Sequence, residues 1–159
     1  MSQVVQITVG CPGSGKSTHA KALVRVHDAQ FAEPKLVYLS SDELRAKFGK
    51  SESDQSVTHT VFDHIHKELD NLLEKGYSVI IDATSINKKN RKKYIDIAKK
   101  YKVRIEALVF IQPKNILLER INKRINQGGR DVPEWVIDKM LNQFENPTIE
   151  EGFTEVYYV

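Results

Sequence analysis

The chain has 159 residues, one cysteine and a formal net charge of +3. The length predicts a single domain that buries about 70% of the surface its unfolded chain exposes, without a stabilising cross-link. One cysteine excludes an intrachain disulfide, and no apolar run approaches the ~20 residues of a membrane-spanning helix. Since the first residues also lack a signal-peptide pattern, we expect a cytoplasmic protein with no membrane partner.

The first predicted elements are a buried strand, a phosphate-binding loop and a helix. Val4 to Val9 is an apolar run, Thr18 to Val26 has helical spacing, and Gly10 to Ser17 between them reads GCPGSGKS. This sequence matches the pattern GxxxxGK[ST] in its required strand-to-helix context, and its glycines let backbone N–H groups meet a polyphosphate. The pattern predicts a nucleoside triphosphate site made by Gly10, Cys11, Pro12, Gly13, Ser14, Gly15, Lys16, Ser17 and Thr18.

Two side chains of this loop have defined roles in the pattern. Lys16 is expected to reach the β and γ phosphates, where its charge neutralises theirs. The Ser17 hydroxyl is expected to hold Mg²⁺. The sequence therefore predicts ATP and Mg²⁺ as cofactors.

The second predicted strand, Leu36 to Leu39, is followed by the sequence SSDELR. Asp42 is expected at the same sheet edge as the phosphate loop, with Arg45 one helical turn later. Such a carboxylate can accept the proton of an attacking hydroxyl, and the arginine can neutralise a phosphate of the acceptor. Helix capping is the alternative: Ser40 and Glu43 have capping-box spacing, and spacing alone favours it.

A predicted helix, Val57 to Glu74, leads to the third strand, Ser78 to Asp82. Asp82 stands at the strand end opposite the phosphate loop. An acid at this position can hold Mg²⁺ or its waters beside Ser17. The alternative is an ordinary turn carboxylate that accepts hydrogen bonds from nearby backbone N–H groups.

Basic residues crowd into the next segment, which contains the helical pattern Lys88 to Lys100. A basic face of this kind attracts a nucleic-acid backbone. It is equally typical of a solvated helix face, so both interpretations stay open. The residues are Lys88, Lys89, Arg91, Lys92, Lys93, Lys99, Lys100, Lys102 and Arg104.

The fourth predicted strand, Val103 to Ile111, precedes the sequence ERINKRINQGGR. Arg120 and Arg124 fall on one helix face, and residues 127–129 interrupt that helix. A basic, glycine-interrupted segment between helices is typical of a lid that closes over phosphates and places arginine on the γ-phosphoryl group. The alternative is a set of surface arginines on an exposed helix.

Apolar β-branched runs thus alternate with amphipathic segments up to a last strand, Glu155 to Val159. This alternation predicts an α/β fold with a parallel sheet and helices on both faces. Ligands bind beyond the carboxyl ends of such strands, where the phosphate loop, Asp42 and Asp82 are expected to meet. No repeat or long linker divides the chain, so we expect one domain over residues 1–159 with a lid at about 120–132.

Together these motifs resemble the kinase domain of the polynucleotide 5′-hydroxyl kinases, both the phage end-repair type and the animal polynucleotide kinase-phosphatases. The resemblance rests on GCPGSGKST, SDELR around Asp42, IIDATSIN around Asp82 and LLERINKR before the lid. It continues in the same order through VPEWVIDKM and QFENPTIEEGF, Gln143 to Phe153. The resemblance spans nearly the whole chain and implies the P-loop kinase fold with the strand order 2-3-1-4-5.

The resemblance also implies roles for single residues. Asp42 resembles the family's general base for the 5′-hydroxyl and Arg45 its contact to a phosphate of the acceptor, which reverses the preference for capping. Because the lid is longer than in the phage type, the arginine that faces the γ-phosphate stays open. The other implied site residues are Lys16, Ser17 and Arg124 as contacts to the triphosphate and the transition state, Arg120 as a neighbouring lid arginine, and Asp82 as an acid near metal and substrate. Arg130, which the longer lid adds, is a further expected contact to the nucleotide.

We therefore predict an enzyme that uses ATP and Mg²⁺ to phosphorylate the 5′-hydroxyl ends of DNA or RNA. Full-length members of the resembled family carry a phosphatase or ligase domain. Since this chain ends with its last predicted strand, 3′-phosphate removal and ligation are not expected. Two alternatives stay open: a small-molecule kinase for a nucleoside, sugar acid or antibiotic, and a nucleotide-dependent, nucleic-acid-binding switch that transfers no phosphate.

Overall fold

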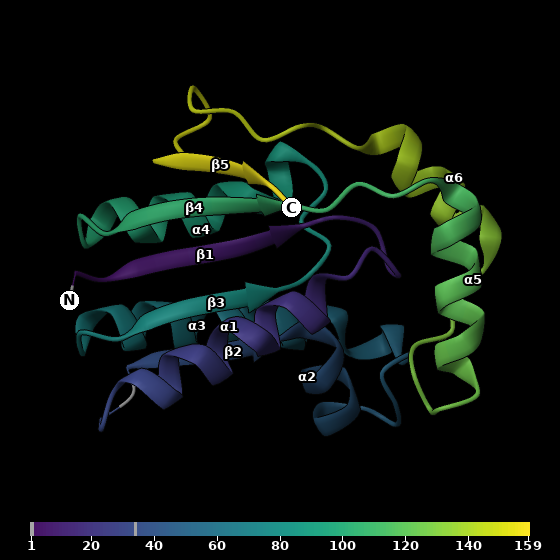
Figure 1. Cartoon of the computed structure of the whole chain (residues 1–159), viewed down its shortest axis with the longest axis horizontal. Helices are drawn as coiled ribbons and strands as arrows, with labels where there is room; N and C mark the ends of the chain where they lie inside the picture. Colours follow the sequence, from purple (N-terminus) through teal and green to yellow (C-terminus); the bar gives the residue numbers. More distant parts are fainter. Residues whose placement is uncertain (1, 34) are drawn as a thin grey trace.

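The computed structural model describes residues 2–33 and 35–159 of the chain. They form a five-stranded sheet with the strand order β2-β3-β1-β4-β5, in which every neighbouring pair is parallel. The predicted parallel sheet and the order 2-3-1-4-5 are confirmed (Figure 1). The strands are β1 (Val4–Val9), β2 (Leu36–Ser40), β3 (Ser78–Asp82), β4 (Arg104–Val109) and β5 (Glu155–Tyr158).

Helices cover both faces of this sheet, as the alternating pattern predicts. Val79 and Ile81 of β3 pack with buried side chains of α3 and α4, whereas Ile80 points to the other face and packs with Ala20 of α1. This division follows from the two-residue period of a strand. The helices are α1 (Lys16–Gln30), α2 (Ser41–Phe48), α3 (Thr58–Glu74), α4 (Lys88–Lys100), α5 (Lys114–Ile125) and α6 (Glu134–Gln143), with a 3₁₀ turn at Gln55–Val57.

The carboxyl ends of the strands point toward α2, α5 and α6, which close one end of the sheet (Figure 1). At this end the phosphate loop joins a second, small core with α5 and α6. Ile121 and Val132 are buried in that core and anchor the predicted lid at these two positions, while residues 122–128, from the last turn of α5 into the following turn, are exposed. The core residues are Cys11, Leu117, Ile121, Val132 and Ile137.

Apart from shifts of one residue at the ends of β2, α3 and β5, the structure differs from the sequence-based expectation in three places. Helix α1 begins at Lys16, two residues earlier than the predicted Thr18. Strand β4 ends at Val109 because its neighbour β1 ends at the paired residue Val9. The prediction of an exposed basic segment is wrong at Arg91, which is completely buried. Across the described ranges, every helix is too short or too polar to span a bilayer.

Candidate active site

The phosphate loop is held in shape by backbone contacts and by the conformational freedom of glycine. Gly13 and Gly15 have φ angles of 83° and 100°, which few other residues adopt. A Cβ atom on Gly13 would lie 2.7 Å from the Leu117 carbonyl oxygen, so no larger residue fits there. The Gly10 N–H donates to the Thr84 carbonyl at 2.9 Å. The loop is thus a preformed cradle at the N-terminus of α1, which suits an anionic phosphate.

Several other residues of the loop have distinct environments. Cys11 lies in the small core, where burial raises the pKa of its thiol, so it acts as a packing residue. Ser14 Oγ is buried and has no hydrogen-bond partner among the residues described. A buried polar atom of this kind is uncommon and fits a ligand that supplies the missing partner. Pro12 lines the cleft, whereas Thr18 is exposed on α1.

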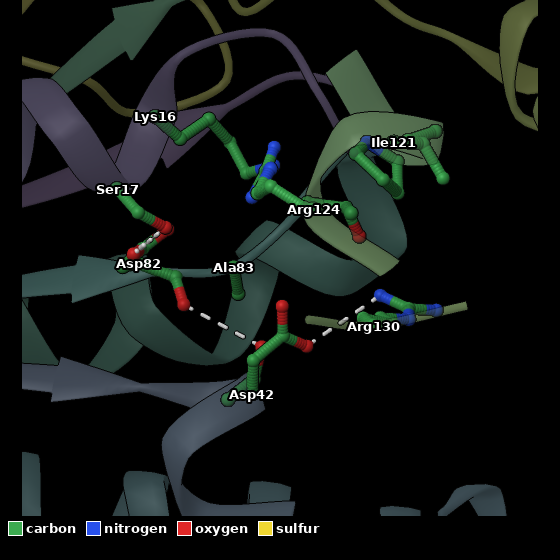
Figure 2. Close-up of a pocket in the computed structure, with 11 residues that line it drawn as sticks. Lys16, Ser17, Asp42, Asp82, Ala83, Ile121, Arg124 and Arg130 are labelled. Carbon is green, nitrogen blue, oxygen red and sulfur yellow. Dashed lines mark hydrogen bonds and ion pairs between the residues drawn. The ribbon is translucent and has the colours of Figure 1, made fainter. Parts of the chain in front are cut away.

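Lys16 is a buried cation in the cleft. Its ammonium group donates to the Cys11 carbonyl oxygen at 3.1 Å, so the side chain folds over the loop. Burial lowers the pKa of Lys16, and the carboxylates of Asp82 and Asp42 oppose this shift. Figure 2 shows Lys16 extending into the cleft beside the guanidinium group of Arg124. Two cations side by side favour an anionic ligand between them, and a triphosphate has that charge.

Asp82 ends β3 on the floor of the cleft, with 4% of the residue exposed. Its Oδ2 atom accepts a hydrogen bond from the Ser17 hydroxyl at 2.5 Å, which leaves the lone pairs of that hydroxyl available. Hydroxyl and carboxylate oxygens are ligands that Mg²⁺ prefers. Residues 2–33 and 35–159 contain no metal-binding group of three or more His, Cys, Asp or Glu side chains. The pair therefore fits Mg²⁺ that is otherwise coordinated by phosphate and water.

Tyr38 of β2 holds the same carboxylate, and sequence reasoning missed it. Its phenol donates to Oδ2 of Asp82. Burial and the charge of Asp82 raise the pKa of Tyr38, so the phenol stays protonated and remains a donor. The relevant signal is the strand register, because Ser40 pairs with Asp82 and Tyr38 lies two residues earlier on the same face. Local sequence does not specify that register.

Asp42 stands on the opposite wall of the cleft, in the first turn of α2. The Ser40 hydroxyl accepts the Glu43 N–H at 3.2 Å and caps this helix. Capping and the cleft acid are therefore assigned to different residues, and the two alternatives from the sequence coexist. Figure 2 shows the Asp42 carboxylate pointing toward the space below the phosphate loop.

Two arginines hold one oxygen of this carboxylate. Arg45 lies 3.0 Å and Arg130 3.7 Å from Oδ1 of Asp42. Arg45 is buried against the Phe62 ring, with 5.8 Å between its guanidinium carbon and the ring centre. The Nε atoms of both arginines are buried without a partner in the described ranges, and burial lowers the pKa of Arg130. The contacts on Oδ1 leave Oδ2 of Asp42 available to the cleft.

The lid arginines occupy different places. Arg124 of α5 lines the cleft, whereas Arg120, one turn earlier, donates to the Gly13 carbonyl at 3.2 Å and braces the phosphate loop. Arg130 lies beside Asp42 on the opposite side. The structure thus brings Arg124 close to Lys16, Arg120 to the phosphate loop and Arg130 to Asp42. Contacts of these three arginines to a nucleotide stay predictions.

The cleft combines these groups in an open space of about 470 Å³. The phosphate loop and α5 form one wall, α2 and Arg130 from the turn after α5 form the other, and the end of β3 with the residues after it forms the floor. The positions agree with the rule that parallel sheets bind ligands at the carboxyl ends of their strands. The lining residues are Pro12, Lys16, Ser17, Ser41, Asp42, Asp82, Ala83, Thr84, Ile121, Arg124 and Arg130.

This fold and this site define a P-loop kinase domain. Residues 5–147 match a family model described as an AAA domain, so the chain belongs to that family. The bifunctional polynucleotide phosphatase/kinase of Schizosaccharomyces pombe is 28% identical over 97% of this chain and 33% of its own length. The L-seryl-tRNA(Sec) kinase of Methanococcus maripaludis is 30% identical over 89% of this chain and 52% of its own.

A solved structure is also similar to this chain in both sequence and fold. A chain of the Pnkp1/Rnl/Hen1 RNA repair complex is 29% identical, with a TM-score of 0.73 over 89% of this chain and 44% of that chain. These matches confirm the resemblance to the polynucleotide kinase family and indicate a phosphotransferase with a nucleotide-binding P-loop. The chain spans about a third of the first curated relative and about half of the second.

Proposed function

We propose that this domain transfers the γ-phosphate of ATP to the 5′-hydroxyl end of DNA or RNA. The observation that carries the proposal is Asp42, whose Oδ2 atom faces the cleft while two arginines hold Oδ1. The acid lies across that cleft from Lys16 and Arg124. The relatives named as polynucleotide and RNA repair enzymes support nucleic acid as the acceptor.

In the reaction, the 5′-oxygen of the acceptor attacks the γ-phosphorus. A bond forms between them, the bond from that phosphorus to the β–γ bridging oxygen breaks, and ADP leaves with the electron pair. The hydroxyl proton goes to Oδ2 of Asp42, which is the general-base role in phosphoryl transfer. Arg45 and Arg130 hold the other oxygen of the carboxylate and so keep it in place.

Charge on the transferring group is stabilised from the other wall of the cleft. The phosphate loop donates its N–H groups, and Lys16 and Arg124 place positive charge where the γ-phosphoryl group sits. Ser17 and Asp82 would hold Mg²⁺, which neutralises phosphate charge when bound. Because all these groups are already in place, catalysis rests on positioning and electrostatics.

Arg45 is the proposed contact to a phosphate of the acceptor strand. Its guanidinium group is buried beside Asp42 and keeps one unpartnered N–H at Nε within the described part of the chain. A phosphate oxygen is a suitable acceptor for that donor. The contact also places a phosphate of the strand next to the base, which orients the terminal hydroxyl.

A second candidate acceptor is a hydroxyl carried by tRNA. The relative named L-seryl-tRNA(Sec) kinase favours it, at 30% identity over 89% of this chain. The same base and the same nucleotide cradle serve either hydroxyl. The difference between the two functions lies in what binds beside Asp42.

The test is transfer of labelled γ-phosphate from ATP to short 5′-hydroxyl oligonucleotides, in DNA and RNA versions. We expect label on 5′-hydroxyl strands and none on 5′-phosphorylated strands. Asp42→Ala should lower turnover about a thousandfold while nucleotide affinity changes less than twofold, since general-base catalysis contributes ~10²–10⁴. Glu43→Ala is the matched control, because Glu43 is exposed on the same turn and pairs with Lys21 outside the cleft.

Parallel reactions contain seryl-tRNA, a free nucleoside and a sugar acid. Label on seryl-tRNA alone would replace the proposal with the tRNA-bound acceptor, and label on a small molecule alone would replace it with a small-molecule kinase. An Asp42→Ala variant with full turnover would remove Asp42 as the base.

A further inference from the structure

A buried ion pair lies behind the cleft, between α4 and the segment that precedes β5. The side chains of Arg91 and Glu151 are 0% and 7% exposed. Arg91 Nε donates to Glu151 Oε1 at 2.7 Å, and Arg91 Nη2 donates to Glu151 Oε2 at 3.0 Å. This is a bidentate contact, the strongest and most directional geometry for such a pair. The proposed reaction makes no use of either residue.

The third donor of Arg91 reaches the loop after β3. It donates to the Ser85 carbonyl oxygen at 2.9 Å. Ser85 has a φ of 44°, in the left-handed region that a residue with a Cβ atom rarely adopts. Such a conformation persists when its surroundings hold it, and it is typical of functional sites. Arg91 is therefore a restraint on a strained backbone position.

This strained loop is directly connected to the phosphate loop. Thr84, the residue before Ser85, accepts the Gly10 N–H at 2.9 Å. One residue further back, Ala83 exchanges hydrogen bonds with the hydroxyl of Thr8, at 2.8 and 3.1 Å. Asp82 comes immediately before these residues. Movement at Ser85 is thus transmitted by backbone to both the phosphate cradle and the acid of the metal site.

The C-terminal segment, residues 145–152, contacts the same loop. The Glu145 N–H donates to the Ile86 carbonyl at 2.8 Å. Gly152, with a φ of 128°, lies so close to α4 that a Cβ atom on it would be 2.6 Å from Ile95. Glu151 therefore enters the core from a segment that is bonded to this loop at Glu145 and packed against α4 at Gly152. Figure 1 shows this segment returning from α6 along the edge of the sheet.

We propose that Arg91 and Glu151 are positioning residues for the nucleotide site. They hold Ser85 in its left-handed conformation. This fixes the Thr84 carbonyl, which accepts the Gly10 N–H of the phosphate loop. The proposal rests on the nucleotide-binding part of the proposed function and is independent of which hydroxyl is phosphorylated. It also gives a role to the QFENPTIEEGF motif, which the chemistry of the cleft leaves without one.

The test must separate positioning from general stability. Removing one partner of a buried ion pair leaves an uncompensated charge, whereas replacing both by apolar residues of similar volume is often neutral. The informative variant is therefore Arg91→Met combined with Glu151→Leu. Its fold is checked by thermal unfolding, and its affinity for Mg·ATP is measured by titration with a fluorescent ATP analogue, without an acceptor.

We expect the double variant to bind the nucleotide about tenfold more weakly, because the competent loop conformation is then populated in only a fraction of the molecules. Adding Ser85→Gly should restore most of the affinity, since glycine adopts the left-handed conformation without strain. Ser85→Ala in the same background is the matched control and should restore nothing. Replacing the exposed pair of the same helix by Lys92→Ala and Asp96→Ala should leave affinity unchanged.

Two results would overturn the proposal. One is a folded double variant whose nucleotide affinity lies within twofold of the parent. The other is a loss of affinity that Ser85→Gly and Ser85→Ala restore equally. Should the double variant not fold, Glu151→Asp retains the charge but shortens the side chain, and the same criteria apply to it. A domain that phosphorylates none of the acceptors offered still gives a result here, because the readout is nucleotide binding.

Discussion

The two walls of the cleft are held in place by different kinds of contact. On the nucleotide side, the contacts are made to the backbone of the loop: the Gly10 N–H donates to the Thr84 carbonyl, and the Gly13 carbonyl accepts from the Arg120 side chain. On the acceptor side, two side chains hold Asp42: Arg45 of the same helix, α2, and Arg130 of the turn after α5. One wall is therefore set by the fold, and the other by a few side chains.

This difference has a consequence for specificity. A backbone cradle is insensitive to most substitutions and serves any reaction that uses the same nucleotide. A wall made of side chains changes whenever one of them changes, so the acceptor can differ between proteins with the same fold. The two curated relatives are indeed named for different acceptors, a polynucleotide and seryl-tRNA(Sec). Variants on the two walls should accordingly affect different kinetic constants.

The largest expected effect is that of Arg124→Ala, on the nucleotide wall. Arg124 lines the cleft beside Lys16, where it faces the proposed position of the γ-phosphoryl group. An arginine at such a position contributes ~10³–10⁵ to turnover, so we expect kcat to fall about a thousandfold. Nucleotide affinity should change little, because the contact forms mainly with charge that develops in the transition state. Single-turnover transfer at saturating ATP measures this loss.

Arg120→Ala is the natural comparison, since it removes the neighbouring arginine of the same helix. Arg120 holds the Gly13 carbonyl, so its loss should weaken nucleotide binding several-fold and leave most of kcat. If Arg120→Ala lowered kcat a thousandfold and Arg124→Ala did not, the assignment of the two lid arginines would be reversed.

Much of the nucleotide wall follows from sequence alone, because the phosphate loop is a local pattern. Eight consecutive residues between a strand and a helix determine where the phosphates bind. The alternation of strands and helices likewise predicts a parallel sheet, and with it the edge where Asp42 and Asp82 meet. The strand order came from the resemblance, since periodicity contains no information about which strands are neighbours.

The contacts that sequence reasoning missed are all made between distant segments. Tyr38 reaches Asp82 through the register of β2 and β3, and Arg91 reaches Glu151 across 60 residues. The sequence pattern assigns Arg91 to a basic surface because the lysines next to it in the chain are exposed. A charge pattern indicates exposure only on average, and a single arginine on the inner face of α4 needs its partner to be recognised.

A moderate effect is expected for Tyr38→Phe, which tests whether the floor of the cleft, beside the nucleotide wall, depends on side chains. The variant removes one donor to Asp82 and keeps the ring. Residues that orient a metal-binding carboxylate change metal affinity ~10–100-fold, so we expect the Mg²⁺ concentration for half-maximal transfer to rise about tenfold. Acceptor KM should stay the same.

Direct binding of Mn²⁺, followed by electron paramagnetic resonance, gives a second measure of the same site. Tyr101→Phe is the matched control, because Tyr101 donates to Asp70 in a similar pair away from the cleft. An unchanged Mg²⁺ requirement in Tyr38→Phe would mean that Ser17 and the strand backbone orient Asp82 without help.

The smallest expected effect belongs to Ser53→Ala, on the acceptor wall. Ser53 accepts the Asp131 N–H at 2.8 Å and ties the turn after α5 to the loop after α2. The contact is exposed, so its loss should cost about 0.6 kcal/mol, near the low end of the range for a single hydrogen bond. Because Arg130 is the residue before Asp131, the change loosens the arginine that holds Asp42. We therefore expect kcat to fall about threefold in steady-state transfer assays.

Nucleotide KM separates this explanation from a general loosening of the lid. Arg120 and Arg124 lie on α5, before Asp131, the partner of Ser53, and the buried Ile121 between the two arginines anchors that helix. If only the acceptor wall depends on Ser53, nucleotide KM stays constant while kcat falls. Ser56→Ala, which removes an exposed hydroxyl that donates to Asp54 within its own turn, should change neither constant. A rise in nucleotide KM in Ser53→Ala would show instead that the lid moves as one body, and the two walls would then be coupled through the α5–α6 turn.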